Sequence, residues 1–189
     1  MKSTSLRTSV PGVLNRPAGG RIPVRLEPLK RSDLNRVSEL LRELDRDYPG
    51  GAAWLHQRLH QTLAGEASCT LARAGRHLIG ATILTPKPHA MKLSTIFVAP
   101  VWRRSGIGSL LLDQAIASPT EHAMKTKPGH DEGEEIPRTE QTTEVYVTVA
   151  HHTWPTLSPL LLSRGFIRTA FECDRYGRGR HEIVATLLR

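Results

Sequence analysis

The residues with the clearest chemical signature lie in a basic turn at 103–109, which reads Arg-Arg-Ser-Gly-Ile-Gly-Ser. Its two arginines can pair with phosphate oxygens, because a guanidinium group is always charged and presents a planar set of donors. Gly106 and Gly108 let the backbone approach an anion closely, because neither residue carries a Cβ. Apolar residues at helical spacing follow, and the first N–H groups of a helix favour an anion. The turn is therefore predicted to bind a phosphate-bearing ligand.

Two common nucleotide-binding motifs do not account for this turn. The sequence lacks the G-x-G-x-x-G spacing of a dinucleotide-binding Rossmann turn and the G-K-[ST] ending of a P-loop. A β-branched and apolar run at Leu93–Val98 precedes the turn and predicts a strand, which Pro100 would end. The remaining pattern is a strand, a basic turn containing glycine, and a Leu-rich helix.

The spacing Arg103-x-x-Gly106-x-Gly108 resembles the acyl-CoA turn of the GNAT (Gcn5-related) N-acetyltransferases, whose pattern is [QR]-x-x-G-x-[GA]. The strand before the turn and the helix after it match the context of that motif in the family. A later helix is expected to end in Gly165-Phe166, as GNAT helices commonly do. The resemblance covers about residues 21–189 and is specific at 93–112.

The resemblance implies an α/β (α+β) fold of the GNAT acyl-CoA N-acyltransferase type, with a mixed, mostly antiparallel central sheet flanked by helices. It implies acetyl-CoA as co-substrate, no metal, and direct attack of an amine on the thioester without a covalent enzyme intermediate. Backbone groups at the strand end would pair with the pantetheine, and the turn would hold the pyrophosphate. The implied cofactor-binding residues are Phe97, Val98, Arg103, Arg104, Ser105, Gly106, Ile107, Gly108 and Ser109.

The residues that would transfer protons are marked less clearly. The family usually places an acidic Tyr four residues before the Gly of Gly-Phe, and this chain has Leu161 there, which cannot donate a proton. Two adjacent histidines follow an expected strand at 144–150, and an imidazole titrates near neutral pH. Two tyrosines in expected loops are alternative acids, and the thiolate of CoA could also leave unaided. The candidate catalytic residues are His151, His152, Tyr48 and Tyr176.

Hydrophobic periodicity predicts the elements that would position these residues. Strands are expected at 21–29, where Pro23 suggests a sheet edge, and at 68–73, 77–85, 93–98, 144–150, 166–173 and 181–188. Helices are expected from Ser32 as N-cap to about Asp47, at 52–63 before Gly65, from Ile107, and from Trp154 to Gly165.

Two stretches fall outside this pattern. Residues 1–20 are predicted to be a disordered basic tail, which leaves 21–189 as the acetyltransferase domain. Residues 119–142 form a polar insert, for which the composition favours disorder over a lid or an acidic segment that attracts a cationic substrate.

Composition limits the class of protein. A chain of 189 residues that is 39% hydrophobic can form one domain with a substantial core. No apolar run approaches the roughly 20 residues that span a membrane, and the two cysteines form neither a disulfide framework nor a zinc pattern. A membrane partner is therefore not expected, and the cytoplasm is the default location.

The formal net charge of +8 raises the question of a nucleic-acid partner. Much of the basic excess precedes residue 32, and no aromatic residues are interleaved with it, so nucleic acid is not favoured. The predicted function is an acetyl-CoA-dependent N-acetyltransferase acting on a primary amine of a small molecule, peptide or protein. Toxin-like acetylation of charged tRNA and a non-enzymatic acyl-CoA-binding module remain alternatives, and the protein could be a monomer or a homodimer.

Overall fold

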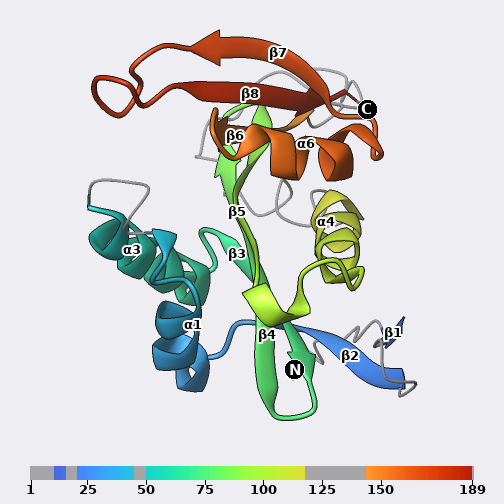
Figure 1. Cartoon of the computed structure of the whole chain (residues 1–189). Coiled ribbons are helices and arrows are strands. Elements are labelled where there is room, and N and C mark those ends of the chain that lie inside the picture. Colours follow the sequence, from blue (N-terminus) through green and yellow to red (C-terminus); the bar gives the residue numbers. More distant parts are fainter. Residues whose placement is uncertain (1–10, 16–20, 45–49, 118–143, 189) are drawn as a thin grey trace, which may run out of the picture. The chain divides into compact units, whose positions relative to one another are not determined.

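The computed structural model describes residues 11–15, 21–44, 50–117 and 144–188 (Figure 1). The polar insert at 119–142 and Tyr48 lie outside these residues. In the described part, strands β1 to β8 form one sheet in the order β1-β2-β3-β4-β5-β6-β8-β7. β5 and β6 pair in parallel, whereas β1 with β2, β2 with β3, β6 with β8, and β7 with β8 are antiparallel. This mixed, mostly antiparallel sheet confirms the predicted fold class.

Most element boundaries agree with the hydrophobic periodicity to within a few residues. The first helix does not, because α1 ends at Leu40 and a turn follows, whereas the helix was expected to continue to about Asp47. The strands are β1 Pro11–Asn15, β2 Arg21–Pro28, β3 Ser68–Ala74, β4 His77–Lys87, β5 Ala90–Val98, β6 Glu144–Ala150, β7 Ile167–Glu172 and β8 Glu182–Leu187. The helices are η1 Arg31–Asp33, α1 Leu34–Leu40, α3 Gly51–Ala64, η2 Pro100–Trp102, α4 Ile107–Ala117 and α6 Trp154–Leu162.

The N-terminal region departs from the sequence prediction. Pro11–Asn15 form β1 within the stretch expected to be a disordered tail, and β1 pairs with β2. Pro23 is therefore not on an edge strand, because β2 lies between β1 and β3, and Pro23 is opposite Val13. Proline has no backbone N–H, so Pro23 cannot donate a hydrogen bond to a neighbouring strand. The sequence pattern alone gave no sign that a further strand would pair with β2.

The chain divides into two compact units. The first comprises the described residues up to Ile83 together with Thr95–Leu112, and the second comprises Leu84–Ser94 and the described residues from Asp113 onward. β4 and β5 each contribute residues to both units.

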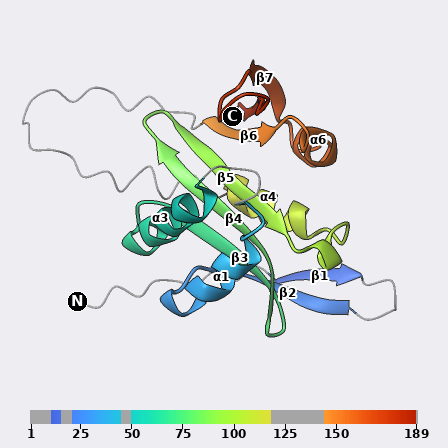
Figure 2. The same ribbon diagram turned by 60° about the vertical axis from the view of Figure 1, so that its left-hand side comes forward.

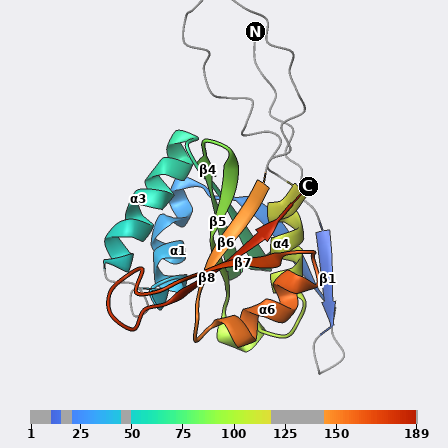
Figure 3. The ribbon, with the colours of Figure 1, turned by 90° about the horizontal axis from the view of Figure 1, so that it is seen from above.

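In the first unit, helices cover both faces of the strands. α1 and α3 lie side by side over β3 and β4 (Figure 2). The first turns of α4 lie on the other side of β4 (Figure 3). Each face has its own apolar cluster, one including Val37, Leu41, Leu55 and Leu59, the other including Val24, Leu26, Ile107 and Leu111. Helix α3 ends at Gly65, whose φ of 82° closes the helix as predicted.

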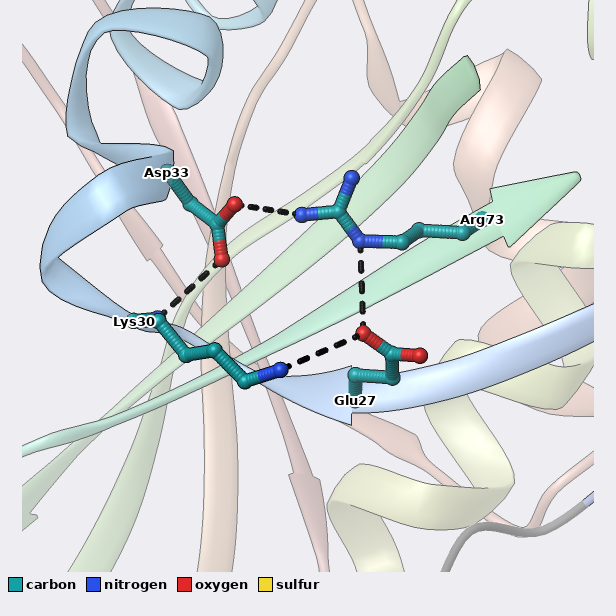
Figure 4. A network of polar contacts seen from close by, with 4 residues as sticks. All are labelled: Glu27, Lys30, Asp33 and Arg73. Carbon is teal, nitrogen blue, oxygen red and sulfur yellow. Dashed lines mark hydrogen bonds and ion pairs between the residues drawn. The ribbon is translucent and has the colours of Figure 1, made fainter. Parts of the chain in front are cut away.

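A cluster of charged side chains connects β2, η1 and β3 in this unit (Figure 4). Arg73 donates to Asp33 at 2.6 Å and forms an ion pair with Glu27 at 3.4 Å. Asp33 also accepts a hydrogen bond from the backbone N–H of Lys30 at 3.2 Å. The chain thus enters its first helix on Asp33, through η1, and the expected N-cap at Ser32 is wrong.

The second unit is built around β6, β8 and β7, with α6 and the end of α4. Apolar side chains of β6 alternate into its core, which also holds Ile183 and Ala185 of β8 and the fully buried Leu161 and Phe166. Arg164, at the end of α6, makes a two-point contact with Asp113 of α4, at 2.9 and 3.1 Å. That hydrogen bonding raises the pKa of Arg164 further, so the contact stays charged.

None of the helices in the described residues is both long enough and apolar enough to cross a membrane.

Candidate functional site

The turn at 103–109 is held between the end of β5 and the start of α4. After β5, the backbone N–H of Ala99 donates to the Ile79 carbonyl of β4 at 2.9 Å. Pro100 then opens η2, and the N–H groups of Trp102 and Arg103 donate to Ala99 and Pro100. The Ser105 hydroxyl donates to the Trp102 carbonyl. These bonds fix the path of the chain between the strand and the helix.

Two residues of the turn have left-handed backbone conformations. The φ of Arg104 is 63°, and that of Gly106 is 85°. α4 begins at Ile107, and its first helical bond joins the Leu110 N–H to the Gly106 carbonyl at 3.1 Å. Ile107 is fully buried and anchors the helix start in the core. The N–H groups of this first turn have no partner within the helix and can therefore donate to an anion.

Gly80 of β4 allows the strand and the helix to come this close. A Cβ at position 80 would lie 2.8 Å from the Phe97 carbonyl oxygen and 2.9 Å from Cδ1 of Leu111. Phe97 is in β5 and Leu111 is in α4, so both flanks of the turn contact the strand at Gly80. Sequence reasoning missed this residue, because one glycine inside a strand pattern does not indicate which neighbour approaches it.

Arg103 lies against the end of β5. Its Nε donates to the Val98 carbonyl oxygen at 3.0 Å, and its guanidinium carbon lies 5.7 Å from the centre of the Phe97 ring. Its terminal nitrogen is 3.8 Å from Glu43, just after α1. The guanidinium expected to hold a pyrophosphate therefore contacts the strand end expected to pair with pantetheine. A ligand that hydrogen-bonds to the Val98 oxygen either shares this acceptor with Arg103 or displaces it, because a carbonyl oxygen has two lone pairs.

The turn carries an excess of positive charge in its own unit. Arg103 and Arg104 are exposed, and Glu43 is the acidic residue paired with Arg103. An exposed guanidinium can move to a phosphate at small cost, because surface ion pairs contribute about 0–1 kcal/mol. Sequence reasoning did not find Glu43, which follows a helix some sixty residues earlier in the chain. The turn residues that were predicted, 103–109, and the strand end at Phe97 and Val98 do lie together.

His151 and His152 follow β6, as predicted, and both are exposed. The His151 N–H donates to the His181 carbonyl at 2.9 Å, and its ring meets the Phe171 ring edge-on, with centres 5.6 Å apart. Both histidines belong to the second unit, whereas the basic turn belongs to the first.

The tyrosines of the second unit lie close to one another. Tyr176 is 37% exposed in the β7–β8 loop, beside Arg175. Burial raises the pKa of Tyr146 in β6, and the charges of Glu144 and of an ionised Tyr176 add to this, while Arg175 opposes it. The Tyr146 phenol is therefore protonated at neutral pH and has a proton to donate. Tyr48, the remaining candidate, lies outside the described residues.

The position where GNAT proteins usually place their acid is part of the core. Leu161 has no exposed surface and lies within α6. A hydroxyl at this position would need a buried partner, and the Leu side chain supplies packing instead.

Comparison with known proteins agrees with this fold. Residues 35–127 match the model of the acetyltransferase (GNAT) family. No curated protein matches the sequence significantly. Among solved structures, the chain is similar to a protein from Desulfovibrio desulfuricans assigned to the GNAT family, with a TM-score of 0.66 and 16% identity over 87% of this chain and 98% of that one.

Two further solved structures contain ligands. The Arabidopsis thaliana NAA60 structure, in complex with a bisubstrate analogue, has a TM-score of 0.64 and 14% identity over 88% of this chain and 99% of that one. A GNAT family acetyltransferase from Elizabethkingia anophelis with acetyl-CoA bound has a TM-score of 0.60 and 16% identity over 88% and 98%. At these identities the likeness establishes the fold, and the family match covers the strand and turn that suggested the resemblance. The chain therefore carries an acetyltransferase domain of the GNAT family.

Proposed function

We propose that the protein is an N-acetyltransferase that transfers the acetyl group of acetyl-CoA to a primary amine by direct attack in a ternary complex. The observation that carries this proposal is the turn at 103–109. There, two exposed arginines and the first N–H groups of α4, which have no partner within the helix, follow the end of β5 after the short helix η2. This combination suits a pyrophosphate next to an extended amide-bearing arm, which are the two parts of CoA that lead to its thioester.

In this proposal the turn binds the pyrophosphate and β5 binds the pantetheine. Arg103 leaves the Val98 carbonyl oxygen, pairs with phosphate, and so frees a backbone acceptor for a pantetheine amide. Arg104 adds a second charge, and the N–H groups of Gly108 and Ser109 donate to the phosphate oxygens. Phe97 supplies further backbone groups at the strand end.

Proton transfer in the proposed reaction needs a base for the amine and an acid for the thiolate. His151 and His152 are the proposed base, since both are exposed and an imidazole can accept a proton near neutral pH. Tyr176 and Tyr48 are the alternative acids predicted from the sequence. Tyr146 of β6 is a further phenol near Tyr176, although burial raises its pKa and so makes it a weaker acid.

One observation favours a second candidate, a non-enzymatic acyl-CoA-binding module. The usual acid is replaced by Leu161, which is fully buried and has no proton to give. The two candidates differ in a thiol-release assay with acetyl-CoA and a panel of amines, peptides and charged tRNA. Thiol release that depends on one acceptor class supports the enzyme and identifies that class. CoA binding without release for any acceptor supports the module.

A variant of the turn tests the cofactor site itself. Gly106→Val places a β-branched side chain at a φ of 85° and in the path of the phosphate. We expect CoA binding, measured by calorimetry, to be lost while the circular dichroism spectrum is unchanged. Gly75→Val, in the β3–β4 turn, is the matched control, because this glycine also has a positive φ and open space around it. Parent-like CoA affinity in Gly106→Val would place the cofactor elsewhere.

A further inference from the structure

Two histidines on α3 bring their ring nitrogens to one point. His56 and His60 are four residues apart on the helix, and both side chains are exposed. Their Nε2 atoms are 3.1 Å apart, and the ring centres are 4.3 Å apart. In this contact one Nε2 donates its proton and the other accepts it. If both imidazoles are neutral and both Nε2 lone pairs face that point, the pair can instead coordinate a cation.

The spacing of these nitrogens is suited to a metal ion. Imidazole nitrogens lie about 2.0–2.1 Å from Zn²⁺, so two of them on neighbouring positions of a tetrahedral or octahedral ion are roughly 2.9–3.4 Å apart. The observed separation of 3.1 Å is within this range. Exposed side chains need only small rotations to direct both lone pairs at one ion.

The nearest cationic side chain of α3 is turned away from the pair. Arg58 donates to Gln61 at 2.6 Å, and its guanidinium carbon lies 5.8 Å from the centre of the Trp54 ring. At about 100° per residue, Arg58 lies roughly 160–200° around the helix from the two histidines. Its charge is therefore held on the opposite face, where it opposes a bound cation least.

We propose that His56 and His60 form a two-imidazole binding site for one divalent first-row transition-metal ion per chain. Among the described residues, no group of three His, Cys, Asp or Glu side chains gathers to hold a metal. Water molecules therefore complete the coordination. Imidazole ligands suit Zn²⁺, Ni²⁺ and Cu²⁺, with Cu²⁺ bound most tightly, and do not suit Mg²⁺.

The proposal is tested by titrating Zn²⁺ into the full chain at about pH 8, where free imidazole is neutral. We expect one ion per chain in the parent, and at least about tenfold weaker binding in His56→Ala or His60→Ala, because the second imidazole binds at high effective concentration. Alanine favours a helix, so both variants should fold. Zn²⁺ should also slow amide hydrogen exchange in α3 of the parent and not of the variants.

Two controls separate this pair from other histidines. His77→Ala removes a single exposed histidine at the start of β4 and should leave the affinity unchanged. The double variant His60→Gln with Gln61→His keeps the number of histidines but places the two rings about 140° apart around the helix, so it should bind as weakly as His60→Ala. Parent-like affinity in any of these α3 variants, one ion per two chains, or equal binding of Mg²⁺ would overturn the proposal.

Discussion

Arg73 and Arg103 belong to the same unit and have opposite surroundings. Arg73 is 13% exposed and contacts two carboxylates, those of Asp33 and Glu27 (Figure 4). Arg103 is 52% exposed and has one carboxylate, Glu43, at 3.8 Å. The first guanidinium joins β2, η1 and β3, and the second lies on a strand end. The difference shows that charge alone does not indicate a binding residue, because a guanidinium must also be free to change partners.

The largest effect expected from this comparison is on folding. Arg73→Met leaves two carboxylates without their shared cation, and one of them, Asp33, is buried. We expect the free energy of unfolding to fall by about 3 kcal/mol, because breaking a mostly buried ion pair leaves an uncompensated charge. Urea denaturation measures this loss. A loss below about 1 kcal/mol, as for a surface pair, would mean that the two arginines do not differ as described.

The change in the free energy of unfolding at alkaline pH tests the surroundings of Cys69, which is influenced by Asp33 of the same cluster. Burial, and secondarily the charge of Asp33, raise the pKa of the Cys69 thiol to about 12, from 9.0. Above pH 9.0 the unfolded chain therefore loses this proton and the folded chain keeps it. The free energy of unfolding should fall with pH there, by at most about 1.4 kcal/mol per unit from this group.

Cys69→Ser is the measurement that isolates this contribution. Lysines and tyrosines also titrate at alkaline pH, but the serine variant lacks only the thiol. Its free energy of unfolding should fall less steeply above pH 9.0 than that of the parent, whatever its stability at neutral pH. Equal slopes would show that the thiol ionises as readily in the folded chain as in the unfolded chain.

The corresponding change in the turn, Arg103→Met, should affect the ligand and not the fold. We expect CoA affinity to fall about tenfold, since a charge-assisted hydrogen bond is worth roughly 1.5 kcal/mol. The free energy of unfolding should change by less than about 0.5 kcal/mol, as for other surface substitutions. Calorimetry measures the CoA affinity, and urea denaturation measures the free energy of unfolding. Loss of stability with unchanged CoA affinity would make Arg103 a second structural arginine.

The smallest expected effect concerns the partner of Arg103. Glu43→Gln removes the carboxylate that competes with phosphate for the guanidinium, so CoA affinity should rise about twofold, in line with the small worth of an exposed pair. The gain should shrink at high salt, which screens exposed charges. Glu39→Gln is the matched control, because this carboxylate of α1 pairs with Arg42 instead. Weaker binding in Glu43→Gln would show that the carboxylate positions Arg103 for the ligand.

The sequence predicted those features that depend on neighbouring residues. The strand before the basic turn and the helix after it follow from local periodicity and composition. The partners of Arg73 and Arg103 could not be predicted in this way, because Asp33 lies forty residues from Arg73, and Glu43 lies sixty residues from Arg103. The prediction of Ser32 as the N-cap of the first helix failed partly for the same reason. Asp33 accepts a hydrogen bond from the Lys30 N–H and is also held by the distant Arg73. The tight contact at Gly80 likewise depends on two distant segments.

The left-handed backbone of Arg104 sets folding and binding against each other at one position. A residue with a Cβ is about 1 kcal/mol less stable at its φ of 63° than glycine would be. A laboratory selection for heat resistance alone should therefore enrich Arg104→Gly, and with it discard a positive charge beside the start of α4. Efforts to make this acetyltransferase domain more robust would then remove a charge from the proposed cofactor site unless binding is selected together with stability.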